Sequence, residues 1–104
     1  MSQFDYTVNV DVLAKYKMSN HAQFLANVSI PAAKRLRNAY KTALESLRSN
    51  PQRCPLYKPD IYIEEELRYL LFSGRYRIVY EIVEKNVYVY DVQDCRQDED
   101  KNLI

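Results

Sequence analysis

Residues 66–92, ELRYLLFSGRYRIVYEIVEKNVYVYDV, decide the fold of this 104-residue chain. Apolar and aromatic side chains alternate with polar ones along the stretch, which is the period of half-buried β-strands. We predict three strands, near residues 66–72, 75–83 and 87–93, with Ser73 and Gly74 as a two-residue hairpin turn.

The register of this hairpin divides its side chains between two faces of the sheet, because a two-residue turn pairs Phe72 with Arg75. We expect one face to form the core, with Leu67, Tyr69, Leu71, Tyr76, Ile78, Tyr80 and Ile82. A second two-residue turn around Lys85 would add Val87 and Val89 to that core. The face away from the helices, here called the open face, is expected to carry Arg68, Arg75, Arg77, Glu81, Tyr88, Tyr90, Val92 and, if the alternation continues, Arg96.

The rest of the chain predicts one strand and two helices ahead of this sheet. Residues 4–10 alternate like a strand, and residues 11–28 have loosely helical spacing. From Pro31 onward, apolar residues recur every three or four positions, and the proline-rich residues 49–59 are expected to form a loop. We therefore predict a single α+β domain over residues 1–104 with the order β-α-α-β-β-β, a helical hairpin on one face of a curved antiparallel sheet, and a flexible acidic tail at residues 97–104.

Composition excludes several classes of site. A single glycine cannot build a P-loop or a dinucleotide fingerprint, so we expect no cofactor. Cys54, Cys95 and His21 are too few ligands for a zinc site, so we expect no metal. We interpret both cysteines as free structural thiols. No apolar run reaches the length of a membrane span and the first residues do not resemble a signal peptide, so we expect a cytoplasmic protein without membrane contact.

Charge is distributed unevenly along the chain. Residues 34–58 contain seven basic residues and one acidic residue, Glu45, whereas the chain from Asp91 onward contains five acidic and two basic residues. The basic segment fits nucleic acid or an acidic protein, or simply a solvated helix face. The arginines and tyrosines of the open face offer planar forks for phosphate or carboxylate and rings for base stacking, although both residue types also suit an ordinary strand surface.

The segments PAAKRLRNAYKTALESLRSNPQRCPLY, GRYRIVYEI and VYVYDVQDCRQ resemble, in order and spacing, the RelE/ParE family of bacterial type II toxin–antitoxin toxins. The resemblance covers nearly the whole chain. It implies a toxin whose concave sheet face acts on the target and whose partner is an acidic, partly disordered antitoxin. We expect that partner to bind across the open face or beside the basic second helix.

Two activities occur in such families, cleavage of ribosome-bound mRNA and inhibition of DNA gyrase, and the sequence favours the first slightly. The RNA-cleaving branch implies catalytic roles for Arg77, Arg68 and Arg96 and substrate contacts for Arg75, Tyr88 and Tyr90. The C-terminal segment RQDEDKNLI lacks the tyrosine or histidine of many RNA-cleaving members.

Arginine stays protonated, so it stabilises charge but supplies no general base. Glu81 is the nearest candidate base on the open face, but we favour a structural role for it. His21 is expected to be an ordinary surface histidine. The alternatives are therefore a gyrase inhibitor without catalytic chemistry and an inactive remnant that only binds an antitoxin.

Overall fold

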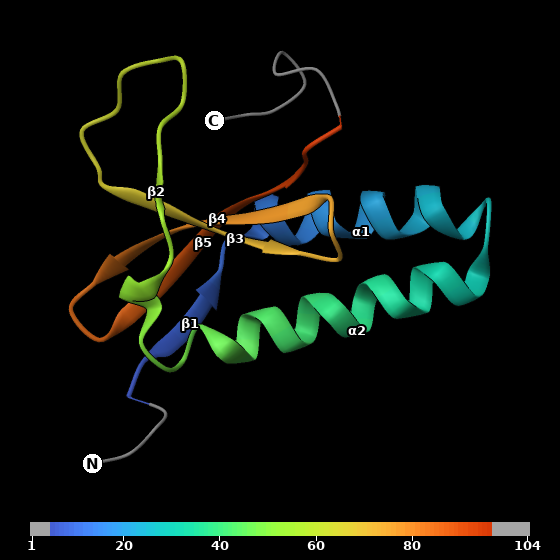
Figure 1. Ribbon diagram of the computed structural model, residues 1–104, viewed down its shortest axis with the longest axis horizontal. Helices are drawn as coiled ribbons and strands as arrows, with labels where there is room; N and C mark the ends of the chain where they lie inside the picture. Colours follow the sequence, from blue (N-terminus) through green and yellow to red (C-terminus); the bar gives the residue numbers. More distant parts are fainter. Residues whose placement is uncertain (1–4, 97–104) are drawn as a thin grey trace.

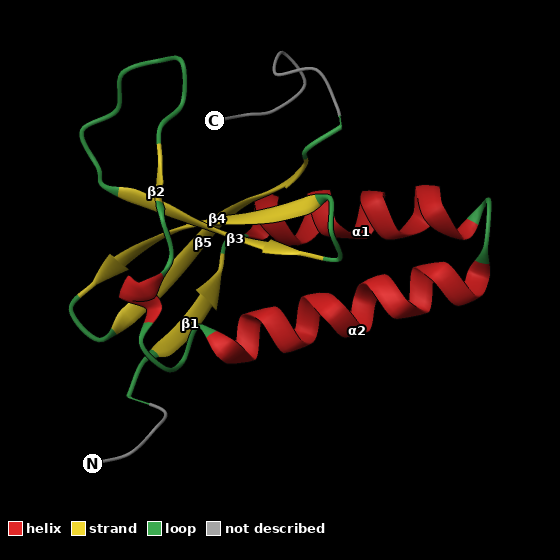
Figure 2. Cartoon of the chain, in the orientation of Figure 1, coloured by secondary structure: helices red, strands yellow, loops and turns green. Residues whose placement is uncertain are grey.

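The computed structural model describes residues 5–96 and has two layers, a hairpin of two helices and a five-stranded sheet (Figure 1). The elements are, in chain order (Figure 2), β1 (Thr7–Val10), α1 (Val12–Ala26), α2 (Ile30–Ser46), the 3₁₀ helix η1 (Pro51–Arg53), β2 (Leu56–Tyr57), β3 (Leu67–Phe72), β4 (Tyr76–Val83) and β5 (Asn86–Asp94). The α+β class and the predicted order are confirmed, with one short strand, β2, added inside the segment predicted as a loop. The predicted tail at residues 97–104 lies outside the described residues.

The first turn of each α-helix is capped by the side chain of the residue before it. Asp11 accepts a hydrogen bond from the main-chain nitrogen of Leu13 at 3.1 Å, and Ser29 accepts one from that of Ala32 at 3.2 Å. Such caps satisfy main-chain donors that have no partner inside the helix. Pro31 lies in the first turn of α2, where its missing N–H costs nothing. Between residues 5 and 96, no helix is both long and apolar enough to cross a membrane.

The strands lie in the order β1-β5-β4-β3-β2. Neighbouring strands are antiparallel except β1, which runs parallel to β5 and pairs Thr7 with Asn86. The predicted antiparallel sheet is found in β2 to β5, and the parallel strand β1 makes the whole sheet mixed. A parallel pair needs a long crossover connection, and here α1 and α2 lie within it.

The core lies between the helices and one face of the sheet. Buried residues of both layers form it: Ala14, Met18, Ala22, Leu36, Ala43, Leu47, Cys54, Phe72, Tyr76, Ile78, Tyr80, Val87, Val89 and Val92. The prediction that the second turn places Val87 and Val89 in the core is confirmed, because Val83 pairs with Asn86 across a two-residue turn.

The first hairpin turn is one residue longer than predicted. Phe72 pairs with Tyr76, so the loop contains Ser73, Gly74 and Arg75. Ser73 and Gly74 have φ angles of 54° and 75°, the left-handed conformation that favours glycine. Because side chains alternate along a strand, a shift of one residue moves every side chain of β3 to the other face.

This shift corrects the predicted faces of β3. Leu70 and Phe72 face the helices, whereas Leu67, Tyr69 and Leu71 lie on the open face, contrary to the prediction. The open face carries a small apolar cluster of its own, formed by Tyr57, Leu67 and Val79 and flanked by Ile63, Tyr69 and Tyr90.

A bulge in β5 moves Val92 off the open face. Val79 pairs with Asp91 and Tyr80 with Val89, so Tyr90 is the extra residue of β5. Beyond the bulge the alternation is reset, and Val92 packs in the helix-side core rather than on the open face where it was predicted.

Candidate functional site

Arg77 lies at the centre of the open face, between β3 and β5. It pairs with Leu71 on one side and with Gln93 on the other. Its Nε donates a hydrogen bond of 2.5 Å to Gln93 Oε1. The guanidinium carbon lies 4.9 Å from the ring centroid of Tyr57 and 5.9 Å from that of Tyr69. Stacking and hydrogen bonding together fix the plane of the guanidinium.

The amide of Gln93 is oriented by two acceptors. Gln93 is fully buried, and its Nε2 donates to Tyr57 Oη at 3.1 Å and to Asp91 Oδ2 at 2.9 Å. An amide that donates through its nitrogen on one side presents its oxygen on the other, which is the oxygen that Arg77 binds.

An ion pair connects this amide to helix α1. Asp91 is fully buried, its Oδ1 lies 2.5 Å from Lys17 Nζ, and the same oxygen accepts a hydrogen bond from the main-chain nitrogen of Val92 at 2.9 Å. A continuous chain of polar contacts thus runs from Lys17 through Asp91 and Gln93 to Arg77. We call these four residues the polar relay.

Glu81 is held by a tyrosine rather than by an arginine. Tyr90 Oη donates a hydrogen bond of 2.6 Å to Glu81 Oε1, and this bond, with burial, raises the pKa of Tyr90 to about 12. Tyr88 lies opposite Glu81 in the register. Glu81 therefore has a structural contact, and its partner is the hydroxyl of Tyr90.

Arg68 lies on the side of the sheet opposite Arg77. It pairs with Tyr80, and its Nη1 donates a hydrogen bond of 2.6 Å to the carbonyl of Cys54. The Tyr80 hydroxyl, whose pKa is raised by burial, donates to the carbonyl of Pro51 at 2.7 Å. Both side chains therefore hold the segment after α2 against β3 and β4. The prediction that Arg68 shares the open face was wrong, because the longer turn reverses the faces of β3.

Arg75 lies in the turn and binds β5. Its Nε and Nη2 contact the two carboxylate oxygens of Asp94 at 3.1 and 2.5 Å, and the guanidinium carbon lies 5.2 Å from the Tyr76 ring centroid. The hydrogen bonds to Asp94 raise the pKa of Arg75. Arg75 was predicted to lie on the open face with Arg77, but its side chain instead binds Asp94 at the end of β5.

Arg96 also meets Asp94, through its main chain. The Arg96 nitrogen donates to Asp94 Oδ1 at 3.0 Å, while the residue itself is exposed. The structure therefore does not bring Arg68, Arg77 and Arg96 together in one cluster. Their catalytic roles, and the substrate contacts of Arg75, Tyr88 and Tyr90, stay predictions.

Sequence reasoning missed four residues of the site: Lys17, Tyr57, Asp91 and Gln93. Tyr57 lies in the proline-rich segment predicted to be a loop, and Asp91 and Gln93 are buried polar residues whose positions follow from the bulge. A buried polar side chain leaves no periodic pattern in the sequence. The burial of Asp91 and Gln93 could therefore be inferred only from the position of the bulge.

His21 is not the surface histidine that was expected. It is half-buried, its Nε2 donates to the carbonyl of Val92 at 2.9 Å, and its ring centroid lies 5.4 Å from that of Tyr76. A carbonyl only accepts hydrogen bonds, so this contact places a proton on Nε2. The histidine therefore joins α1 to β5 on the side away from Arg77.

The arrangement around Arg77 suits binding of an anion or a carboxylate. Its Nε is occupied by Gln93, and a guanidinium still has two Nη groups in a planar fork. Among the residues that the structure describes, no group of three histidine, cysteine, aspartate or glutamate side chains could hold a metal ion. Cys54 is buried, Cys95 is exposed, and both are free thiols, as expected.

Comparison with known protein families matches residues 8–99 to the ParE toxin of the type II toxin–antitoxin system parDE. A search of curated proteins gave no match. The matched range contains every helix and nearly every strand residue of the fold, including all members of the polar relay. The chain therefore belongs to the ParE toxin family of type II toxin–antitoxin systems.

Proposed function

We propose that this toxin inhibits its target by binding, with DNA gyrase as that target, rather than by cleaving messenger RNA. The observation that carries the proposal is the separation of the arginines. Arg77 lies on the open face, Arg68 binds the Cys54 carbonyl on the helix side, and Arg75 binds Asp94. This separation supports a binding site organised around Arg77 alone, rather than a cluster of cations around one scissile phosphate.

The acid–base chemistry supports the same proposal. Cleavage by a ribose 2′-hydroxyl benefits from a general base close to that hydroxyl. Within the described residues, Glu81 accepts the Tyr90 hydrogen bond, and Asp91, which the polar relay connects to Arg77, is buried and paired with Lys17. His21 lies on α1, and its side chain binds the Val92 carbonyl of β5 on the helix side of the sheet. A site that recognises a protein surface through Arg77 needs neither group.

One observation favours ribosome-dependent cleavage of mRNA as the second candidate. The Arg77 guanidinium lies near two tyrosine rings, Tyr57 and Tyr69, and its fork is suited to a phosphate. Aromatic rings beside an arginine are also a surface on which an unpaired base can stack.

Two assays with purified toxin separate these candidates. Supercoiled plasmid is incubated with gyrase and toxin, and the accumulation of cleaved DNA and the loss of supercoiling are measured. A reporter mRNA in a translating extract is examined for new 5′ ends. We expect a gyrase effect and intact mRNA. New 5′ ends within codons, with gyrase unaffected, would reject the proposal in favour of cleavage.

The same assays test the position of the site. Arg77→Ala should lower gyrase inhibition by at least tenfold if the fork binds a carboxylate or phosphate in the target. Arg37→Ala is the matched control, because Arg37 is exposed on α2, on the helix layer of the molecule. Equal losses in the two variants would show that general charge, rather than the open face, mediates binding.

A further inference from the structure

The segment between β2 and β3, residues 58–66, extends from the sheet beside the open face. Figure 1 shows it, in yellow-green, at the end of the molecule away from the turn between α1 and α2. Ile63 returns the segment to the sheet, where it packs against the open-face cluster that contains Tyr57. The base of the segment is therefore held next to Tyr57, whose ring centroid lies 4.9 Å from the guanidinium carbon of Arg77.

Two large apolar side chains, Ile61 and Tyr62, are exposed at the middle of this segment, here called the tip. Ile61 is 63% exposed and Tyr62 is 89% exposed. A single exposed apolar residue is ordinary, but neighbouring ones that stay in water mark a surface where another molecule binds. Loops fixed on a rigid sheet commonly carry binding residues, and tyrosine is enriched among the residues that dominate protein interfaces. The tip therefore has the composition of a protein contact.

A hollow lies between the tip and the sheet. Its volume is about 280 Å³, and the residues around it include Leu56, Tyr57, Leu67 and, from the segment itself, Glu65 and Glu66. Small-molecule sites usually measure roughly 300–1,000 Å³, so this hollow suits a single long side chain better. Lysine and arginine lay their alkyl stems along apolar surface and place their charged ends near carboxylates. The hollow therefore fits one basic side chain of a partner.

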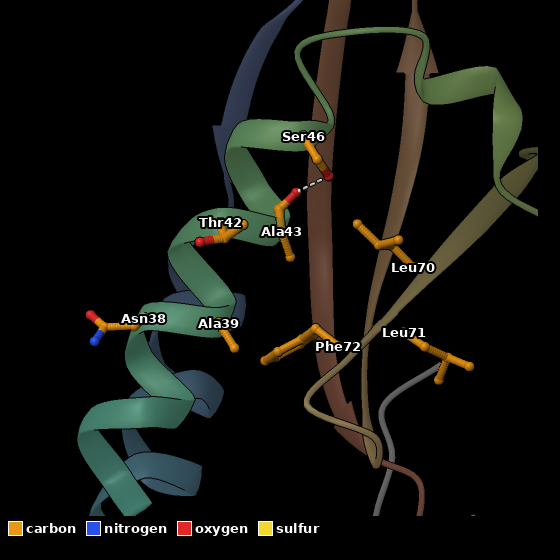
Figure 3. Close-up of a pocket in the computed structure, with 8 residues that line it drawn as sticks. All are labelled: Asn38, Ala39, Thr42, Ala43, Ser46, Leu70, Leu71 and Phe72. Carbon is orange, nitrogen blue, oxygen red and sulfur yellow. Dashed lines mark hydrogen bonds between the residues drawn. The ribbon is translucent and has the colours of Figure 1, made fainter. Parts of the chain in front are cut away.

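The groove between α2 and β3 has a different character. It has a volume of about 430 Å³ and is lined by side chains of both elements, among them Ala39, Ala43, Leu70 and Phe72 (Figure 3). None of the described residues around that groove is charged. The carboxylates therefore distinguish the hollow beside the tip as the place for a cation.

The whole segment is acidic. It contains one base, Lys58, and four acids, and all of these residues are exposed: Asp60, Glu64, Glu65 and Glu66. Glu66 pairs with Arg68 at 3.3 Å, and no ion pair to the other three acids is found within residues 5–96. Such a segment repels the phosphates of RNA and DNA and attracts a basic protein surface. The partner that fits it is therefore a protein.

We propose that residues 58–66 form a contact element for a protein target, in which the tip packs against apolar surface of that target and a basic side chain of the target enters the hollow beside Glu65. The inference rests on the proposed function and deepens it, because Tyr57 both lines the hollow and contacts Arg77. The target surface then offers a carboxylate to Arg77 and, beside it, an apolar patch with a lysine or arginine. Opposite charges at two points fix the orientation of the target on the open face.

Tyr62→Ala is the decisive variant, because it removes the most exposed large apolar side chain of the described residues. Val28→Ala is the matched control, since Val28 is 77% exposed in the turn at the other end of the molecule (Figure 1). Affinity is measured by titrating labelled toxin with purified DNA gyrase. We expect Tyr62→Ala to weaken the affinity about tenfold or more and Val28→Ala to change it by no more than about threefold. Circular dichroism melting checks that both variants are folded, and Ile61→Ser replaces Tyr62→Ala if that variant is not.

A charge reversal tests the hollow. Glu65→Lys places a cation where the proposal puts the basic side chain of the target, so association should slow, and more at low salt than at high salt. Glu45→Lys makes the same change of charge at an exposed position of α2 and should leave the association rate nearly unchanged. Tighter binding of Glu65→Lys, or equal effects of the two reversals, would overturn the assignment of a basic partner group to the hollow.

Equal affinity of wild type and a folded Tyr62→Ala variant for gyrase would overturn the inference and leave the proposed function intact. If wild-type toxin does not bind gyrase, the proposed function fails, and growth arrest by induced toxin decides on the segment. Loss of arrest with Tyr62→Ala but not with Val28→Ala, at equal soluble expression, would support a contact with another protein. Equal arrest by the two variants, or no arrest by wild type, would overturn the inference. Binding of wild type to RNA or DNA that Tyr62→Ala abolishes would also overturn it, because the tip would then stack on bases.

Discussion

Replacing Arg77 with alanine tests whether the open face is organised around this guanidinium. The substitution removes the donor to Oε1 of Gln93, a residue with no exposed surface. A hydrogen bond to a charged group contributes about 1.5–3 kcal/mol, and a partly exposed cation–π contact such as that with Tyr57 adds about 0.5–1 kcal/mol. We expect Arg77→Ala to lower the free energy of unfolding by about 2–4 kcal/mol, whereas a freely exposed strand position would lose only about 0.5–1 kcal/mol.

Urea unfolding followed by circular dichroism measures this loss. A second variant, Gln93→Leu, and the double variant complete a thermodynamic cycle, in which we expect a coupling energy of about 1–3 kcal/mol between the two positions. Arg37→Ala, the exposed arginine of α2, should change stability by no more than about 0.5 kcal/mol. A loss below about 1 kcal/mol for Arg77→Ala, with coupling near zero, would refute the reasoning, because Arg77 would then be an independent surface residue.

Three other substitutions test the contacts that surround the site. Lys17→Met should lower the free energy of unfolding by about 3–5 kcal/mol in urea, because it leaves the buried Asp91 carboxylate without its cation; a loss under about 1 kcal/mol would contradict a buried ion pair. Tyr80→Phe should cost about 1–2 kcal/mol through the Pro51 carbonyl. Burial raises the pKa of Tyr80 above its usual 10.0, so the stability of the wild type should fall as the pH rises above that value. Thermal melts across this pH range should show a smaller fall for the Tyr80→Phe variant. Equal pH dependence in the two proteins would contradict a buried Tyr80 hydroxyl. Burial alone would raise the pKa of Asp94, but hydrogen bonds, led by that from Arg75, lower it below 3.8. The ion pair therefore stabilises the fold fully above pH 3.8, and this stabilisation is lost as the pH falls through the lowered pKa. The stability difference between wild type and Arg75→Ala should therefore be largest near neutral pH and shrink in acid; a difference independent of pH would argue against this ion pair.

The helices could be predicted from the sequence because their signals are local. Asp11 and Ser29 cap the first turns, and apolar residues repeat at helical spacing through α2. The length of the first hairpin turn could not be predicted in the same way. Arg75 belongs to the turn, where its side chain binds Asp94 and its carbonyl accepts a hydrogen bond from Cys95, and both partners lie at the far end of the next hairpin. Contacts between residues so distant in sequence leave no periodic pattern.

The candidate site was predicted in part. Arg77 was identified correctly as an open-face residue, because its position in the alternation of β4 does not depend on the turn. Arg68 was assigned to the wrong face because its position depended on the turn alone. Gln93 and Asp91 became visible only with the β5 bulge, and Tyr57 only with the short strand β2. Elements of one or two residues are where tertiary contacts outweigh local preference.

The parallel pair of β1 and β5 joins opposite ends of the chain, and this has a consequence for the order of events during synthesis. Among the strands of residues 5–96, β1 leaves the ribosome first, but its strand partner β5 leaves last. β5 also supplies Gln93 to Arg77 and Asp91 to Lys17. Neither the complete sheet nor the polar relay can form until β5 has emerged, and pairing across such a separation in sequence is slow. The open face around Arg77 is thus incomplete while the chain is being synthesised, and a partner already present in the cell can meet the chain before that face has formed.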